Sequence, residues 1–136
     1  MTTPIALDSN VLKPLLRQYG ERVYGKVASE ELSVYIPIPV YAEQVIYPGN
    51  VMENLLDAFG ARVIPLEVKH ANRLGEIWNT LPGPLRRWRE HKFDWLIASM
   101  SHYEEWVLVT DDDDPPFQIR GLRRMKLDEF IAQYLE

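Results

Sequence analysis

Acidic residues recur in this sequence where a buried strand is predicted to end or a helix to begin. Asp8 follows a short apolar run, and the acidic run 111–114 follows the strand-like segment 106–109. Glu43 and Asp94 each fall early in a segment with helical spacing. One such carboxylate gains about 0.3–1 kcal/mol from capping or from the helix dipole, so each has an ordinary structural explanation. Their repetition at corresponding places instead indicates a shared carboxylate site.

Carboxylates gathered at one edge of a sheet repel one another and take up protons unless a cation neutralises them. The chain contains no cysteine, which excludes a thiolate zinc site and a disulfide scaffold. Oxygen ligands favour the hard ions Mg²⁺ and Mn²⁺ over zinc. Such an ion can lower the pKa of a coordinated water and stabilise negative charge on a phosphodiester. The residue types therefore point to metal-assisted hydrolysis.

Asp94 is predicted to be partly desolvated. It lies beside, rather than opposite, the apolar stripe of a predicted helix formed by Phe93, Leu96, Ile97 and Met100. A carboxylate in this position needs a partner. A metal ion is one candidate, and Lys92 or an arginine is the alternative.

The net charge of −5 argues against a protein that binds nucleic acid through an evenly basic surface. Eight of the fifteen lysines and arginines nevertheless fall into two clusters, one on each side of the acidic run. These clusters are Arg86, Arg87, Arg89 and Lys92, and Arg120, Arg123, Arg124 and Lys126. Both are candidates to hold RNA phosphates, and Trp88 is a candidate to stack on an unpaired base for about 1–3 kcal/mol. The alternatives are a solvated loop with Trp88 covering the core, and arginines that meet an acidic partner peptide.

The elements that must position these residues alternate along the chain. Strands are predicted at 5–7, 33–36, 62–66 and 106–109. Helices are predicted from Val11 onward with Pro14 in the first turn, and at 21–28, 40–46, 52–59, 67–78, 93–100 and 127–134, with 80–91 as a loop. This alternation predicts an α/β fold whose parallel sheet is covered on both faces. The length predicts a single domain spanning 1–136.

Nothing in the sequence predicts export or membrane insertion. The longest apolar runs span six or seven residues, too short for a membrane crossing. The first residues show neither the basic nor the long apolar region of a signal peptide. Together with the absence of cysteine, these features predict a cytoplasmic protein.

Four segments resemble, in order, the conserved motifs of PIN domains. They read LDSNVL at 7–12, PVYAE at 39–43, KFDWLIA at 92–98 and LVTDD at 108–112. Each motif alone is weak, but the ordered set spans most of the chain with matching strand and helix contexts. The length and single-domain layout are similar to those of VapC-type toxins of toxin–antitoxin pairs.

The resemblance implies a three-layer α/β/α PIN-like fold with a mainly parallel central sheet of four or five strands. It implies a Mg²⁺- or Mn²⁺-dependent endoribonuclease that acts on an RNA substrate, forms a homodimer and pairs with a cognate antitoxin protein. Its catalytic and metal-binding acids would be Asp8, Glu43, Asp94 and Asp112. Asp8 and Asp94 are the expected direct ligands. Ser9, Asn10 and Thr110 match polar positions that orient the carboxylates.

The fourth motif departs from the family pattern, in which an aromatic residue follows the acid within a few positions. Here Phe117 comes only after the rest of the acidic run and two prolines, so the loop is longer. The register favours Asp112 as the fourth acid, with Asp111 and Asp114 as alternatives.

Two other functions fit parts of the pattern. A PIN-like module that binds RNA or a partner without cutting would share the fold, although it has no need of four acids. A haloacid-dehalogenase-like phosphatase also begins with a strand ending in aspartate, but it needs a second aspartate where this chain has Asn10. His70, His91 and His102 show no metal-binding spacing, and surface or packing roles are expected for them.

Overall fold

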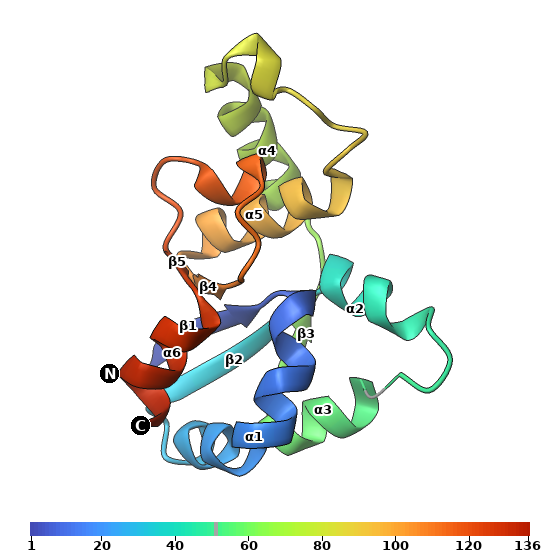
Figure 1. Ribbon diagram of the computed structural model, residues 1–136. Coiled ribbons are helices and arrows are strands. Elements are labelled where there is room, and N and C mark those ends of the chain that lie inside the picture. The colour runs from blue at the N-terminus through green and yellow to red at the C-terminus, as the bar shows by residue number, and fades with distance from the viewer. Residues whose placement is uncertain (51) are drawn as a thin grey trace.

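The computed structural model describes residues 1–50 and 52–136, with a parallel β-sheet at its centre (Figure 1). Within these ranges five strands run in the order β3-β2-β1-β4-β5, and all neighbours are parallel. They are β1 (Thr3–Leu7), β2 (Leu32–Pro37), β3 (Arg62–Ile64), β4 (Val107–Val109) and β5 (Arg124–Met125). The expected α/β class and the parallel sheet are confirmed.

Helices cover both faces of the sheet, which gives the expected three-layer arrangement. α1 packs against α3 below the sheet in Figure 1, whereas α4 and α5 pack together above it. The helices are α1 (Ser9–Ala28), α2 (Ile38–Val45), α3 (Met52–Phe59), α4 (Val68–Thr80), α5 (Lys92–Glu104) and α6 (Leu127–Phe130), with a π-helical turn at Ile131–Leu135 and 3₁₀ turns η1 (Gly83–Leu85) and η2 (Pro115–Gln118). Among the helices of the described ranges, none combines the length and the apolar character that a membrane crossing requires.

β1 is the central strand, and its apolar sequence explains that position. It pairs with β2 on one side and β4 on the other, and its residues Ile5, Ala6 and Leu7 are completely buried. A strand of a parallel sheet with both faces covered has no exposed side and is therefore apolar throughout. Because the strands are parallel, the carboxyl ends of β1, β2 and β4 meet at one edge, where open α/β sheets bind ligands.

The first helix differs from its prediction in two ways. α1 begins at Ser9 and continues to Ala28, so the separate helix expected at 21–28 is its second half. The early start places Pro14 at the sixth helical residue, beyond the first turn, and the expected position was wrong. The cause is Asp8, whose carboxylate accepts a hydrogen bond from the backbone N–H of Ser9 and caps the helix earlier than the apolar spacing indicates.

The buried face of α5 also differs from the predicted stripe. Ile97 and Met100 are buried as expected, but Phe93 is 42% exposed and Trp95 is completely buried. α4 packs on this helix and rotates the buried face toward Trp95, whose ring lies 5.3 Å from that of Trp78. The indole N–H of Trp95 donates to the carbonyl of Arg87, so its one polar atom is satisfied inside the core.

Candidate active site at the carboxyl edge of the sheet

Asp8 lies where the two central strands end. Its backbone N–H donates to the carbonyl of Val109 at 3.1 Å, which ties the end of β1 to the end of β4. The side chain is almost completely buried, with 4% of the residue exposed. The buried strand that precedes Asp8 and the helix that follows it therefore fix this carboxylate in place.

Three donors hold the Asp8 carboxylate. The Thr110 hydroxyl donates to Oδ2 at 2.7 Å, and the Ser9 backbone N–H donates to Oδ1 at 2.8 Å. The Asn10 side-chain amide lies 3.4 Å from Oδ2 and also donates to Thr110 Oγ1 at 3.2 Å. Burial raises the pKa of Asp8, and the charge of Asp112 adds to this, although the hydrogen bonds from Thr110 and Ser9 oppose it. The three residues expected to support the acids thus contact Asp8 directly.

Glu43 reaches the same edge from α2. This helix follows β2 at once because Pro39 occupies its first turn, where a missing N–H costs no hydrogen bond. The Ser9 hydroxyl donates to Glu43 Oε1 at 3.2 Å. Partial burial raises the pKa of Glu43, and the charge of Asp8 raises it further. Ser9 therefore contacts two of the expected acids, Asp8 through its backbone and Glu43 through its side chain.

Asp94 lies in the first turn of α5 with 22% of its side chain exposed, so its expected partial desolvation is confirmed. Burial raises its pKa to about 7, and the charges of Asp8, Asp112, Glu43 and Asp114 contribute to the shift in that order. Because these four charges repel an ionised Asp94, its ionised form would be favoured only if positive charge were added among them. The structure thus brings all four expected acids into one electrostatic environment, together with Asp114.

The carboxylates of the acidic run after β4 form two groups, one that contacts the segment 124–127 and one that lies near the other acids. Asp111 Oδ1 accepts a hydrogen bond from the backbone N–H of Leu127 at the start of α6, and Asp113 pairs with Arg124 at 2.7 Å and Lys126 at 3.3 Å. These two cations, with Arg124 first, hold the pKa of Asp113 below its ordinary value.

Asp112 and Asp114 occupy the other side of the loop. The Asp112 backbone N–H donates to Thr110 Oγ1 at 3.1 Å, and its Oδ1 accepts from the Asp114 backbone N–H at 2.8 Å. Their charges both raise the pKa of Asp94. Of the alternatives for the fourth acid, Asp111 is engaged at α6, whereas Asp112 and Asp114 lie near the other acids.

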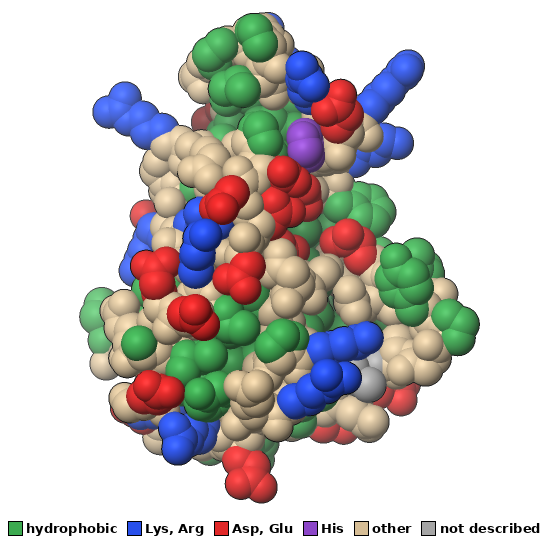
Figure 2. All heavy atoms as spheres, in the orientation of Figure 1, with side chains coloured by type: hydrophobic (Ala, Val, Ile, Leu, Met, Phe, Trp, Pro, Cys, Tyr) green, Lys and Arg blue, Asp and Glu red, His purple; other side chains and the backbone are tan. Residues whose placement is uncertain are grey.

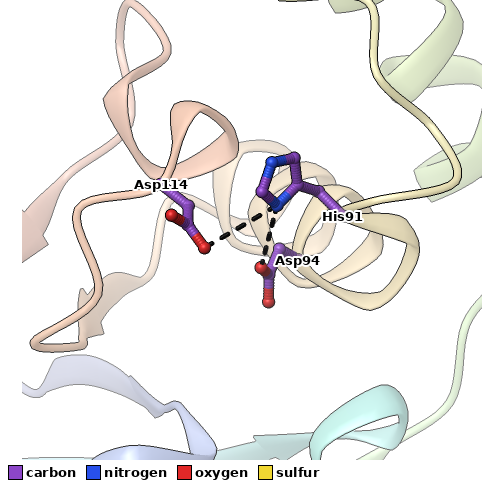
Figure 3. A group of neighbouring side chains, drawn as sticks. All are labelled: His91, Asp94 and Asp114. Atoms are coloured by element: carbon purple, nitrogen blue, oxygen red, sulfur yellow. Dashed lines mark ion pairs between the residues drawn. The ribbon is translucent and has the colours of Figure 1, made fainter.

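His91 joins this site although its spacing in the sequence gave no indication of it. Its Nδ1 lies 3.7 Å from Asp94 Oδ2 and 3.7 Å from Asp114 Oδ2. Figure 3 marks both ion pairs with dashed lines. His91 and Asp94 are three residues apart at the start of a helix, which is the only local signal. The contact with Asp114 depends on how the loop after β4 folds, and no spacing reveals it.

Several of the expected RNA-contacting arginines make hydrogen bonds within the protein. Arg86 donates to the carbonyls of Leu81 and Asn79. Arg87 donates to the carbonyl of Pro84 and forms an ion pair with Glu90. Arg123 donates to the carbonyl of Glu105.

Arg124 is half-buried and donates to the carbonyl of Asp112 at 2.7 Å, so it supports the acidic loop. Arg89 and Arg120 are both exposed, and Trp88 is 40% exposed with its ring edge-on to Trp78. Figure 2 shows basic side chains projecting above a group of acidic side chains on this face. The contacts with RNA stay predictions.

The chemistry of this donor set fits a divalent cation. It consists of carboxylate oxygens that are partly buried and that raise one another's pKa values, with Asp8 held rigidly by three donors. Within residues 1–50 and 52–136, the ion pairs at these acids involve His91 alone as the partner. A hard ion with oxygen ligands would supply the missing positive charge.

No protein-family profile and no curated protein matches this sequence. Solved structures do match the fold. VapBC2 from Rickettsia felis bound to a promoter DNA fragment has a TM-score of 0.63, VapBC-1 from nontypeable Haemophilus influenzae one of 0.65, and DNA-bound VapBC from Salmonella typhimurium one of 0.58. In each case the identity is 18%, and the match covers 91% of this chain and 98% of the other. The chain therefore has the PIN-like α/β/α fold found in VapBC toxin–antitoxin structures, as its four motifs predict.

Proposed function

We propose that this protein is a metal-dependent endoribonuclease and the toxin of a type II toxin–antitoxin pair. The observation that carries the proposal is the convergence of Asp8, Glu43, Asp94 and Asp112 at the carboxyl edge of the sheet, where their charges act on one another. Partly buried carboxylates in this arrangement disfavour the folded state unless a cation binds. The arrangement therefore fits a metal-binding site better than a stabilising contact.

In this proposal Asp8 and Asp94 hold the ion, and Glu43 and Asp112 complete its surroundings. Mg²⁺ or Mn²⁺ bound there would activate water and neutralise charge on the phosphodiester during hydrolysis. Thr110 and Asn10 keep the Asp8 carboxylate in one orientation by hydrogen bonds to Oδ2. Ser9 holds Glu43 near Asp8 through its hydroxyl. These polar side chains position the acids.

The RNA would meet the positive charges that surround the acids. Arg89 and Arg120 lie on the loops that lead into α5 and follow η2, and they can neutralise backbone phosphates. Trp88, 40% exposed, offers a face on which an unpaired base can stack. Arg86 and Arg87 shape this loop by bonding its carbonyls while their charge still attracts the RNA backbone.

The proposed partners are an antitoxin protein and a second copy of the chain. The structures with this fold are VapBC complexes, which supports pairing with an antitoxin. Two large apolar residues at the end of α2, Ile46 and Tyr47, are 73% and 61% exposed, and a partner would shield them from water.

Cleavage of end-labelled structured RNAs, including tRNA, tests the proposed activity. The purified chain is incubated with Mg²⁺, Mn²⁺ or EDTA, beside the variants Asp8→Asn and Asp94→Asn. Each variant removes one charge at nearly constant volume, so we expect a folded protein without cleavage. Asp57→Asn is the matched control, because Asp57 is exposed on α3, away from the sheet edge.

Two results would contradict the proposal. Cleavage that continues in EDTA or in both site variants would show that the acids are not the catalytic centre. In the second, the wild-type chain binds Mn²⁺ but cleaves none of these RNAs, even after any copurified partner has been removed under denaturing conditions and the chain refolded. This result would favour a silent RNA- or partner-binding module.

A further inference from the structure

A histidine stands beside the acidic site and brings a nitrogen ligand to it. His91 Nδ1, a carboxylate oxygen of Asp94 and a carboxylate oxygen of Asp114 all lie within 4.8 Å of one another. Figure 3 shows the three side chains converging from two segments, the start of α5 and the loop that leads into η2. None of the four motifs contains His91 or Asp114.

The backbone holds the imidazole in this position. The N–H of His91 donates to the carbonyl of Trp88 at 3.2 Å, and its own carbonyl accepts from the N–H of Trp95 at 2.8 Å. Trp95 is completely buried, so this bond anchors His91 to the core. The His91 side chain is 17% exposed, while that of Asp114 is 47% exposed, which leaves a path from solvent to the group.

The surroundings favour an ion over a simple ion pair. One imidazolium contributes at most a single positive charge, yet it faces Asp94 and Asp114 with Asp112 beside them. A divalent ion bound by one nitrogen and two carboxylate oxygens would supply the charge that the histidine alone lacks. Imidazole suits transition metals, whereas Mg²⁺ prefers oxygen ligands and dehydrates reluctantly.

We propose that His91, Asp94 and Asp114 form a mixed nitrogen–oxygen position for a divalent transition-metal ion, next to the all-oxygen site and sharing Asp94 with it. This inference rests on the metal site of the proposed function and adds a ligand and a metal preference to it. Its consequence is that Mn²⁺ binds the chain more tightly than Mg²⁺, and that the difference depends on His91.

Pulsed electron paramagnetic resonance of Mn²⁺ bound to the full chain, without RNA, tests the nitrogen ligand. We expect a ¹⁴N coupling in the wild type that is lost in His91→Gln. His102→Gln is the matched control, since His102 is a half-buried histidine on the same helix that contacts Arg73 at 2.8 Å. That variant keeps the coupling.

Affinity measurements give a second readout. In titrations followed by the free Mn²⁺ signal, His91→Gln and Asp114→Asn each weaken Mn²⁺ binding about 10-fold, while Mg²⁺ binding changes less than about twofold. Circular dichroism verifies that each variant is folded. Asp114→Asn keeps the imidazole intact, so it tests the group even where His91→Gln perturbs the fold.

Three results would overturn the inference: no Mn²⁺ binding, no ¹⁴N coupling in the wild type, or a coupling that persists in His91→Gln. The outcome is separate from that of the proposed function. Metal-dependent RNA cleavage without a nitrogen coupling would refute the mixed site and leave the nuclease standing. A nitrogen coupling in a chain that cleaves no RNA would support the mixed site and refute the nuclease.

Discussion

Two histidine–carboxylate groups lie at opposite ends of α5, and they differ in how their charges are balanced. At the far end, His70 is completely buried, its Nδ1 accepts from the Glu67 backbone N–H at 3.0 Å, and its Nε2 lies 3.2 Å from Glu104. Lys69 also pairs with Glu104 at 3.2 Å. At the near end, His91 faces Asp94 and Asp114.

The difference separates a structural group from a site that needs a ligand. Glu104 has a lysine and a histidine for one carboxylate, and every ring nitrogen of His70 has a partner. Asp94 instead lies among four other carboxylates, and burial with their charges raises its pKa to about 7. The same residue types therefore stabilise the fold where their charges balance, and they favour binding of a cation where negative charge is in excess.

The largest expected effect contrasts the two carboxylates directly. Asp94→Asn should lower the rate of RNA cleavage about a thousandfold, because it removes a metal-binding charge from the reaction centre. Glu104→Gln, at the balanced end, should leave the rate within about threefold of the wild-type value, because that carboxylate lies outside the proposed site. Single-turnover cleavage at saturating Mn²⁺ measures both, and equal losses in the two variants would erase the distinction.

Metal binding at the His91 end of α5, where negative charge is in excess, should stabilise the folded protein. At about 100 times its dissociation constant, Mn²⁺ should raise the free energy of unfolding by about 2.7 kcal/mol in the wild type. The gain should disappear in Asp94→Asn, because both proposed metal positions use this carboxylate, and should persist in Glu104→Gln. Urea unfolding with and without the ion gives these values, and an equal gain in both variants would locate the ion elsewhere.

The pH dependence of stability follows from the raised pKa of Asp94. The folded protein holds this proton up to about pH 7, whereas the unfolded chain releases it near pH 3.8. Unfolding therefore releases a proton between these values, and stability falls as pH rises through them. Without metal, Asp94 contributes a loss of about 2 kcal/mol between about pH 5 and about pH 7.

Urea unfolding of the wild type and of Asp94→Asn across this pH range measures the contribution. The variant should lose clearly less stability than the wild type, because the asparagine side chain does not titrate. The raised pKa values of Asp8 and Glu43 act on stability in the same direction as that of Asp94. A wild type that gains stability as pH rises through this range would contradict the assignment.

The sequence predicts most of what positions the acids. Asp8 and Thr110 follow strands whose apolar residues are contiguous, and Pro39 marks the helix that carries Glu43. The helical spacing predicts Asp94 at the edge of a buried face, and its partial burial agrees. These features are local, since burial on both faces and capping each leave a pattern within a few residues.

The features that the sequence does not predict arise from contacts between distant segments. β5 has only two residues, and it is a strand because distant residues form hydrogen bonds with it. One of these bonds joins the N–H of Thr110 to the carbonyl of Met125. His91 meets Asp114 only after the loop beyond β4 has folded. Trp95 takes the place of Phe93 in the core because of Trp78 on α4. No periodicity within a segment encodes such pairs.

The smallest effect concerns the two histidines themselves. His70→Gln should lower the free energy of unfolding by about 1.5 kcal/mol, because it leaves a cavity around a completely buried ring and loses the bond to the Glu67 N–H. His91→Gln should cost less than about 0.5 kcal/mol in the absence of metal, since it removes only two contacts at 3.7 Å, with Asp94 and Asp114. Urea unfolding in EDTA at neutral pH compares them. A larger loss for His91→Gln than for His70→Gln would mean that His91 is needed for the fold, and the contrast between the two ends of α5 would fail.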